Sequence, residues 1–364
     1  MSRLSARLGG VRNALFLLAV LGLGLILLAD ILLVDHILDP WGYFNLFFII
    51  TALLYGVYPL FVNRRLTRYY WERTRRNRIA ILGLAFIAFL TLVALVGPLF
   101  IPDPTRGNIG EEDMPPLGIS YEQSFYDADS GRIVSQVVTG TWARPLGTDD
   151  RGRDLLAMLI SGARISLRVG LQAILVSISI GVIIGLVSAY RGGVVDQVLM
   201  RFTDIMMTFP TFILLVLVVS IFDANLNLII LFIGIFGWTG AARMVRSEAL
   251  SLRTRDFITA SRSLGASDSR IIFRHLMPNV MSIIIVMMTL GIPSVILAEA
   301  ALSFIGLGDP TVASWGQILK AGQESLDTTW WVAVEPGIML FLTVLAFNFF
   351  GDGLRDAFDP RSQV

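Results

Sequence analysis

Side chains that carry enzyme chemistry are scarce in this chain. It has no cysteine and two histidines, His36 and His275, so it offers no thiol chemistry and no basis for a histidine metal site or a Ser-His-Asp triad. Of its 29 basic residues only Lys320 is a lysine, and it does not lie in the Gly-Lys-Ser/Thr of a phosphate-binding loop. We therefore expect no metal or cofactor on this chain, and any ATP-driven function must use an ATPase carried by a partner.

The composition is that of a membrane protein. Hydrophobic residues make up 55% of the 364 residues and charged residues 16%, whereas a soluble domain has about 25% charged residues. A bilayer core requires about 20 apolar residues per helix. We therefore predict an all-α polytopic membrane protein with about eight transmembrane helices, and we exclude a soluble enzyme. Eight stretches of 16 to 24 residues contain no Asp, Glu, Lys or Arg, namely 13–29, 40–63, 79–102, 169–190, 205–222, 224–242, 275–298 and 336–351.

The charges between these stretches predict an orientation. Segment 63–78 holds seven arginines and one glutamate, which places it in the cytoplasm by the positive-inside rule. Two spans before it then form a hairpin, and both chain termini are cytoplasmic. We expect the spans at about 14–34, 42–62, 79–101, 165–190, 206–222, 225–245, 279–301 and 334–352.

The predicted organisation has five segments. Within the fourth, Gly181 and Gly185 are spaced for close helix packing, although glycine is also simply common in membrane helices. The external segment is rich in Pro, Gly, Asp and Glu, and the strand-like run 132–138 predicts short strands in a small loop domain. The segments are an N-terminal extension (1–78), the first span of the core (79–102), an external loop domain (103–164), the core with a cytoplasmic loop at 248–277 (165–354), and a cytoplasmic tail (355–364).

The loop 248–277 carries a helical pattern. Small and apolar residues recur at positions i, i+3, i+4 and i+7, which predicts a short helix with one narrow apolar face. Gly265 ends the pattern as a C-cap, and Ser267 is expected to cap a second short helix. Periodicity alone favours a connector on the lipid surface, and the alternative is a helix docked in a groove of a cytoplasmic protein. The patterned residues are Phe257, Ala260, Ser261 and Leu264.

The same loop resembles that of binding-protein-dependent ABC importer permeases. The family pattern is Glu-Ala-Ala, three residues, Gly, and later Leu-Pro. Here Thr259-Ala260-Ser261 stands for Glu-Ala-Ala, Gly265 for the glycine and Met277-Pro278 for the closing pair, and Thr259 removes a charge that could contact an ATPase. Further blocks near 146–164, 190–210, 298–316 and 351–361 resemble the C-type subunit of the dipeptide/oligopeptide/nickel subgroup, so that only 1–78 falls outside the usual six-span subunit.

The resemblance implies a set of partners. The chain would form a heterodimer with a second permease subunit in the lipid of the cytoplasmic membrane. Two cytoplasmic ATPases would bind ATP and Mg²⁺, an external solute-binding protein would deliver the solute, and nucleic acid is not a partner. Peptide is the main cargo of the subgroup, and nickel and oligosaccharides stay open. The loop would be the coupling helix, with Arg253 and Arg255 at its periphery and the ATPase contacted by Asp256, Phe257, Thr259, Ala260, Ser261, Arg262, Leu264 and Gly265.

Two other classes of function were weighed. A transporter or channel driven by an ion gradient would need ionisable residues within its spans, and the uncharged stretches offer almost none. An intramembrane enzyme ranks last, because no cluster of His, Asp and Glu is available.

Four residues are candidates for a gate or an external contact. Glu299 is expected at the outer end of its span, where an interfacial position would keep the carboxylate hydrated. Asp149 and Arg153 could meet the binding protein, or they could form a charged turn that satisfies itself. Trp315 is expected in an outer aromatic belt with Trp330 and Trp331.

One charged residue, Asp204, is expected at the inner boundary of its membrane span, and a neighbouring residue in the sequence could pair with it. Asp204 lies one helical turn from Arg201, which predicts an ion pair between them.

Overall fold

The computed structural model describes residues 22, 40–51, 64–101, 103–104, 106–127, 132–222 and 224–358. The chain forms two compact units, Met1–Arg76 and Asn77–Val364. In the first, the described helices are α2 (Pro40–Thr51) and the arginine-rich α4 (Arg64–Thr74). The span predicted at 14–34 lies outside the described residues apart from Gly22, and the span predicted at 42–62 lies partly outside them.

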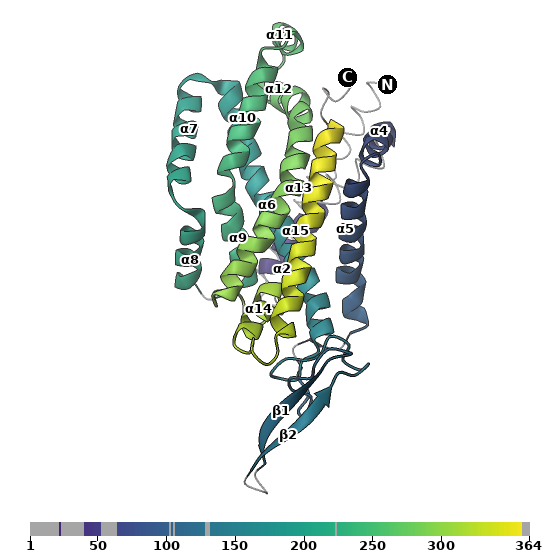
Figure 1. Ribbon diagram of the computed structural model, residues 1–364. Helices are drawn as coiled ribbons and strands as arrows, with labels where there is room; N and C mark the ends of the chain where they lie inside the picture. Colours follow the sequence, from purple (N-terminus) through teal and green to yellow (C-terminus); the bar gives the residue numbers. More distant parts are fainter. Residues whose placement is uncertain are drawn as a thin grey trace. The chain divides into compact units, whose positions relative to one another are not determined.

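The second unit is helical, with one β-hairpin (Figure 1). Strands β1 (Ser120–Asp127) and β2 (Arg132–Thr139) pair antiparallel, which confirms the strand predicted at 132–138. The helices are α5 (Arg78–Val96), α6 (Leu155–Arg191), α7 (Gly193–Thr208), α8 (Thr211–Ile221), α9 (Leu226–Gly237), α10 (Thr239–Arg253), α11 (Asp256–Ser263), α12 (Asp268–Ile271), α13 (Met277–Phe304), α14 (Trp315–Gln323) and α15 (Trp331–Phe358), with a 3₁₀ turn at Gly97–Leu99 and a π-helical turn at Ile272–Leu276.

The described residues contain up to six membrane spans in this unit. Four single helices are long and apolar enough to cross a bilayer, and they are Arg78–Leu99, Leu155–Arg191, Asp268–Phe304 and Trp331–Phe358. The pairs α7–α8 and α9–α10 are bent by 77° and 41°, and each has the length and composition of one further span. All six correspond to spans predicted from residue 79 onward.

Helix α6 is longer than predicted. It begins at Leu155, ten residues before the expected start, because the Asp154 side chain accepts hydrogen bonds from the N–H groups of Leu156 and Ala157. Its 37 residues rise about 55 Å, against about 30 Å for a bilayer core. One rigid element therefore extends beyond the membrane at the ends of the unit. The sequence carries this capping signal in Asp154, which lies inside the predicted external segment 103–164.

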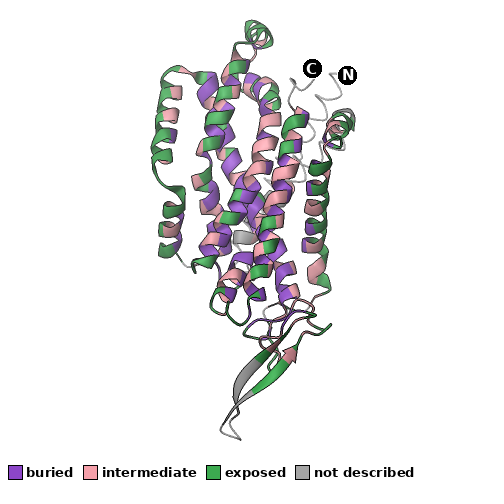
Figure 2. Ribbon diagram, viewed as in Figure 1, coloured by how far each residue is buried: buried purple, intermediate pink, exposed green. Residues whose placement is uncertain are grey.

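Glycines bring α6 and α10 into close contact. A Cβ on Gly181 would lie 2.6 Å from Ala241 Cβ, and one on Gly185 would lie 2.6 Å from the carbonyl oxygen of Ala242. The close approach predicted for this glycine pair is thereby confirmed. Figure 2 shows buried residues concentrated along α6 and exposed residues over α7 and α8.

We predict that Gly185→Ala destabilises the fold. The added methyl group meets the α10 backbone, and overpacking of this kind costs about 1–3 kcal/mol. Thermal unfolding in detergent should show a lower midpoint. Gly240→Ala is the matched control, because a Cβ on Gly240 meets no atom within 4 Å and should leave the midpoint unchanged or slightly higher. Equal midpoints for the two variants would contradict this account of the packing.

Candidate coupling site

Helix α11 is a short helix with a defined end. Gly265 has φ +78°, a conformation that glycine adopts without the clash of a side chain. The N–H of Gly265 donates to the carbonyl of Arg262 at 3.0 Å, and the N–H of Ala266 donates to that of Ser261 at 3.1 Å. This pair of bonds is a Schellman motif, so the predicted C-cap is confirmed.

The predicted second short helix is not a separate element. Helix α12 continues through the π-helical turn at Ile272–Leu276 into α13, so that residues Asp268–Phe304 form one span. Ser267 has the extended backbone of an N-cap, but its hydroxyl makes no capping hydrogen bond, contrary to expectation. A displacement of α11 therefore reaches a membrane span after a turn of only a few residues.

The patterned face of α11 points outward, and another residue anchors the helix. Ile258 is 1% exposed, whereas Phe257 is 41% and Leu264 is 88% exposed. Ile258 was missed because one aliphatic residue in a polar helix gives no periodic signal. Leu264 leaves its whole side chain at the surface, which is unfavourable for an isolated chain in water.

Polar contacts fix this region to the end of α6. The Tyr190 hydroxyl donates to Asp268 Oδ1 at 2.7 Å, and Arg253 Nη1 donates to the carbonyl of Ala189 at 3.0 Å. The Arg262 guanidinium lies 5.6 Å from the centre of the Tyr190 ring. Arg253 was expected at the periphery of a partner contact, and instead it is used inside the chain. Sequence reasoning missed Tyr190, which lies outside the loop.

The structure brings the predicted contact residues together on one exposed helix. Ser261 is half-buried, and its hydroxyl lies 3.3 Å from His275 Nε2. The ring of Phe257 lies 6.3 Å from that of His275. The other predicted contact residues are exposed, and they are Asp256, Phe257, Thr259, Ala260, Arg262, Leu264 and Gly265.

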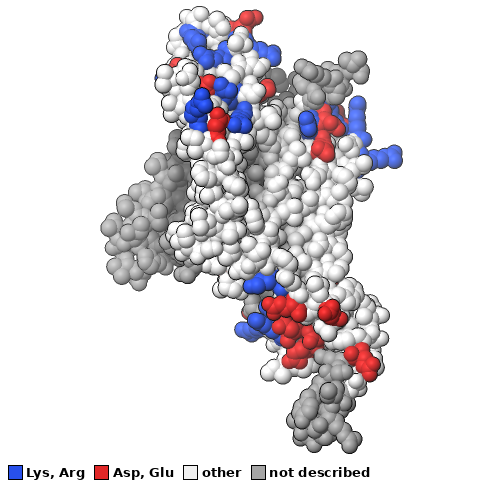
Figure 3. Space-filling model, turned by 60° about the vertical axis from the view of Figure 1, so that its left-hand side comes forward, with Lys and Arg blue, Asp and Glu red and all other residues white. Residues whose placement is uncertain are grey.

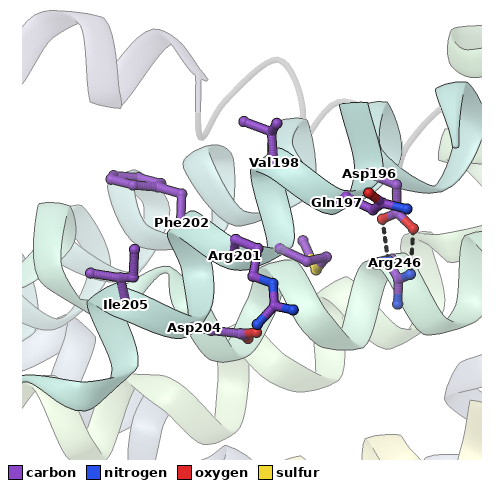
Figure 4. A pocket seen from close by; sticks show the side chains of 9 residues that line it. Asp196, Gln197, Val198, Arg201, Phe202, Asp204, Ile205 and Arg246 are labelled. Carbon is purple, nitrogen blue, oxygen red and sulfur yellow. Dashed lines mark hydrogen bonds and ion pairs between the residues drawn. The ribbon is translucent and has the colours of Figure 1, made fainter. Parts of the chain in front are cut away.

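Ion pairs join α7 to α10 near the same end of the unit. Arg246 forms a two-point pair with Asp196, at 2.6 and 2.5 Å, which Figure 4 shows. Asp204 pairs with Arg243 of α10 at 2.6 Å, so the predicted pair with Arg201 is wrong. The pairing depends on tertiary structure, because the fold brings Arg243 of α10 within reach of Asp204. The residues next to Asp204 in the sequence could not predict this.

At the opposite end, Asp149 and Arg153 belong to a charged turn whose hydrogen bonds and ion pair are made within the turn itself. Asp149 is 1% exposed and accepts hydrogen bonds from the backbone N–H groups of Arg151 and Arg153, at 3.0 and 2.8 Å. The Arg153 guanidinium completes the arrangement at 2.6 Å. Arg153 also lines a cavity of about 270 Å³ together with Asp150 and Lys320.

The structure contradicts the expectations that Trp315 lies in an outer aromatic belt and that Glu299 is hydrated. Trp315 and Trp331 are buried, and their indole N–H groups donate to the carbonyls of Leu159 and Thr148, so neither belongs to an outer aromatic belt. Trp330 is 43% exposed.

Glu299 is 1% exposed and therefore not hydrated. Ser303 donates to its Oε1 at 2.7 Å, and its Oε2 has no hydrogen-bond partner among the described residues. The unpredicted helix α14 packs on α13 at this end, and Gly316 has no room for a Cβ beside Ala300 and Ser303.

Arg144 ties the external loop to α6. Its guanidinium pairs with Glu111 at 2.9 Å and with Asp154, the cap of α6, at 3.0 Å. Hydrogen bonds from Asn108 and Arg144 lower the pKa of Glu111. Figure 3 shows charged side chains gathered around this loop and around α10 and α11, with an uncharged band between them. The band matches the requirement that a bilayer core excludes charge.

Comparison with known proteins identifies the family. The family described as "Binding-protein-dependent transport system inner membrane component" matches residues 181–364, and "N-terminal TM domain of oligopeptide transport permease C" matches residues 65–116. The oligopeptide transport system permease protein OppC of Haemophilus influenzae is 36% identical over 293 residues, covering 80% of this chain and 88% of that protein. The chain belongs to the binding-protein-dependent transport permeases.

A second relative agrees with this placement, and one solved structure is similar in part. The dipeptide transport system permease protein DppC of Bacillus subtilis is 37% identical over 294 residues, covering 80% of this chain and 84% of that protein. A solved structure of the MetNI methionine ABC transporter in inward-facing conformations aligns with a TM-score of 0.47 and 20% identity, covering 56% of this chain and 98% of that chain. The permease is a multi-pass membrane subunit of an ABC importer, as the family and the oligopeptide and dipeptide permeases show, and the interpretation as an ion-gradient transporter is not supported.

We predict that Tyr190→Phe loosens α11 without unfolding the permease. The variant removes only the hydroxyl that binds Asp268. A partly buried hydrogen bond of this kind contributes about 1 kcal/mol, or about fivefold in local opening. Hydrogen–deuterium exchange over 256–276 should accelerate by that factor. Tyr121→Phe is the control, because it removes a similar hydrogen bond, to the carbonyl of Asp113, at the opposite end. Unchanged exchange in the Tyr190 variant would show that the bond does not restrain α11.

We predict that Asp113→Asn stabilises the permease at neutral pH. Burial, with the carboxylates of Asp150, Asp149 and Glu112, raises the pKa of Asp113, so its ionised form weakens the fold. A raised folded-state pKa means that stability is complete at low pH and declines as pH rises.

The asparagine side chain stays neutral, and asparagine also suits the positive φ of 56° at this position. The thermal midpoint should rise by about 1–3 °C at pH 7.5 and the gain should shrink as the pH falls through the raised pKa. The exposed Asp327→Asn serves as the control. A gain of the same size at low pH would exclude the electrostatic cause.

Proposed function

We propose that this chain is one of two permease subunits of an ABC importer that carries peptides across the inner membrane. The names of the relatives support peptide as cargo, since those proteins are oligopeptide and dipeptide permeases. The partners are a second permease subunit, two ATPases that bind ATP and Mg²⁺, and a solute-binding protein. In this arrangement the α11 end and both chain termini are cytoplasmic. The added segment is shorter than the predicted 1–78, because the match to the N-terminal domain of oligopeptide transport permease C begins at residue 65.

One observation carries the proposal for the coupling role. Helix α11 exposes Leu264 and Phe257 while Ile258 and the contacts to α6 hold its base. A helix-in-groove contact needs exposed apolar anchors on a rigid support. Closure of the ATPases would move α11, and the helix would pass the movement to α6 through Tyr190 and to α13 through the π-helical turn. The proposed ATPase contact comprises Asp256, Phe257, Thr259, Ala260, Ser261, Arg262, Leu264 and Gly265.

At the outer end we propose a smaller role for the predicted residues. Arg153 faces the 270 Å³ cavity, so it is the candidate for contact with the solute-binding protein. Asp149, Trp315 and Glu299 are buried, and they would act by holding the outer ends of α6 and α13 in place.

The test replaces the exposed anchor of α11. Leu264→Ser should leave folding intact, because the side chain is at the surface, and it should weaken ATPase binding about tenfold by removing apolar contact. Gly265→Val should act more strongly, because a β-branched residue disfavours φ +78° and breaks the Schellman motif. The measurements are copurification of the ATPases and ATP-dependent peptide uptake in proteoliposomes.

The control is Ile109→Ser, which removes an even more exposed aliphatic side chain from the external loop. Competition with dipeptide, oligopeptide, nickel and oligosaccharide tests the cargo. Intact assembly and coupled uptake in both α11 variants would refute the coupling role, and uptake competed by nickel or oligosaccharide alone would refute peptide as cargo.

A further inference from the structure

Helix α4 presents arginines and aromatic rings on the same exposed arc. A helix turns about 100° per residue, and at this pitch the exposed side chains that the structure describes on α4 cover about 160° of its circumference. Thr74 lies on the opposite side and is 3% exposed. The exposed side chains are Arg64, Arg68, Tyr69, Trp71 and Glu72, with the two aromatic rings at the edges of the arc.

The positive charge of this arginine-rich segment is not balanced by its own acids. Glu72 is its one acidic residue, and it pairs with Arg68 at 2.8 Å. Three further arginines are exposed, and none of them has a hydrogen bond or an ion pair among the described residues. These are Arg64 at the start of α4 and Arg75 and Arg76 in the turn after it.

The position of α4 in the chain places its end near the membrane surface. The helix ends at Thr74, four residues before Arg78, where the α5 span begins. Four residues reach at most about 14 Å. The headgroup layer on each side of the hydrocarbon core is about 5–8 Å thick. The C-terminal end of α4 therefore lies in this layer or directly beside it.

The residue types on the arc suit the headgroup layer. Arginine is costly in the hydrocarbon core, and the rings of Trp and Tyr are enriched at the membrane–water interface. Arg73 links the two kinds of side chain, because its Nη1 donates to the Tyr69 hydroxyl at 3.2 Å and its guanidinium lies 5.6 Å from the centre of that ring. An amphipathic helix with this composition inserts its rings at a lipid surface and attracts anionic headgroups.

We propose that the exposed arc of α4 and the turn after it bind anionic phospholipids. Trp71 and Tyr69 lie at the edge of the hydrocarbon, and Arg64, Arg75 and Arg76 face the lipid phosphates. The lipid supplies the negative charge that the described part of the chain does not. The lipids belong to the cytoplasmic leaflet, and this assignment of the leaflet rests on the orientation proposed above.

The absence of cysteine from the chain allows a direct test. Trp71→Cys and Trp330→Cys are matched variants, because each replaces a tryptophan, 48% and 43% exposed, and neither changes the charge. The transporter carrying each variant is labelled with benzophenone maleimide in vesicles of equal phosphatidylglycerol and phosphatidylethanolamine and then illuminated. Mass spectrometry measures the ratio of the two lipid adducts. We expect about fivefold more phosphatidylglycerol adduct at position 71, the effect of about one arginine, and equal amounts at position 330.

Two triple variants in the Trp71→Cys background test the arginines. Arg64→Gln, Arg75→Gln and Arg76→Gln together should bring the adduct ratio to about one. Lysine at the same three positions should keep the ratio, because the attraction depends on charge. Salt at about 1 M, where the Debye length is about 3 Å, should also lower the ratio at position 71.

Three outcomes overturn the proposal. These are equal ratios at positions 71 and 330, an unchanged ratio in the glutamine variant, and adducts at position 71 with an ATPase or another protein in place of lipid. The last result would make the arc a protein-docking surface. The adduct ratio requires neither uptake nor ATP hydrolysis, so a failure of the importer function is distinguishable from a failure of the lipid site.

Discussion

Close contact between the α6 and α10 backbones is the constraint on which the other contacts of the permease depend. Gly181 and Gly185 leave no space for side chains, so the two helices cannot shift without separating. Because α10 leads directly into α11, this contact sets where the exposed helix emerges from the membrane domain. The same contact brings Arg246 of α10 to Asp196 of α7, which follows α6 in the chain.

Helix α6 connects the polar contacts at the two ends of the permease unit. At one end Asp154 caps it and pairs with Arg144 of the external loop. At the other end Tyr190 binds Asp268 of α12 and lies against Arg262 of α11. Between these points the helix is a continuous hydrogen-bonded rod that carries displacement better than a loop would. In the coupling role that we propose, movement imposed on α11 would reach across the thickness of the membrane through α6.

The membrane also explains why ionisable residues lie where they do. The uncharged band confines most charge to two zones. Two residues outside these zones, Asp204 and Glu299, are paired or enclosed by protein. Glu299 is enclosed because α14 packs on α13 at the outer end. Asp204 is held by Arg243, a residue 39 positions away in the sequence. Each exception marks a place where tertiary packing replaces water.

The sequence by itself determined the local features of this protein. The uncharged runs predicted six spans in the described permease unit, since apolar length is a property of contiguous residues. Gly265 predicted the end of α11, and the Gly181 and Gly185 spacing predicted close packing, because both follow from the absence of a side chain. Only the tertiary structure decided which face of α11 points outward, which arginine pairs with Asp204, and whether Trp315 is buried. These depend on partners distant in sequence, and periodicity carries no information about them.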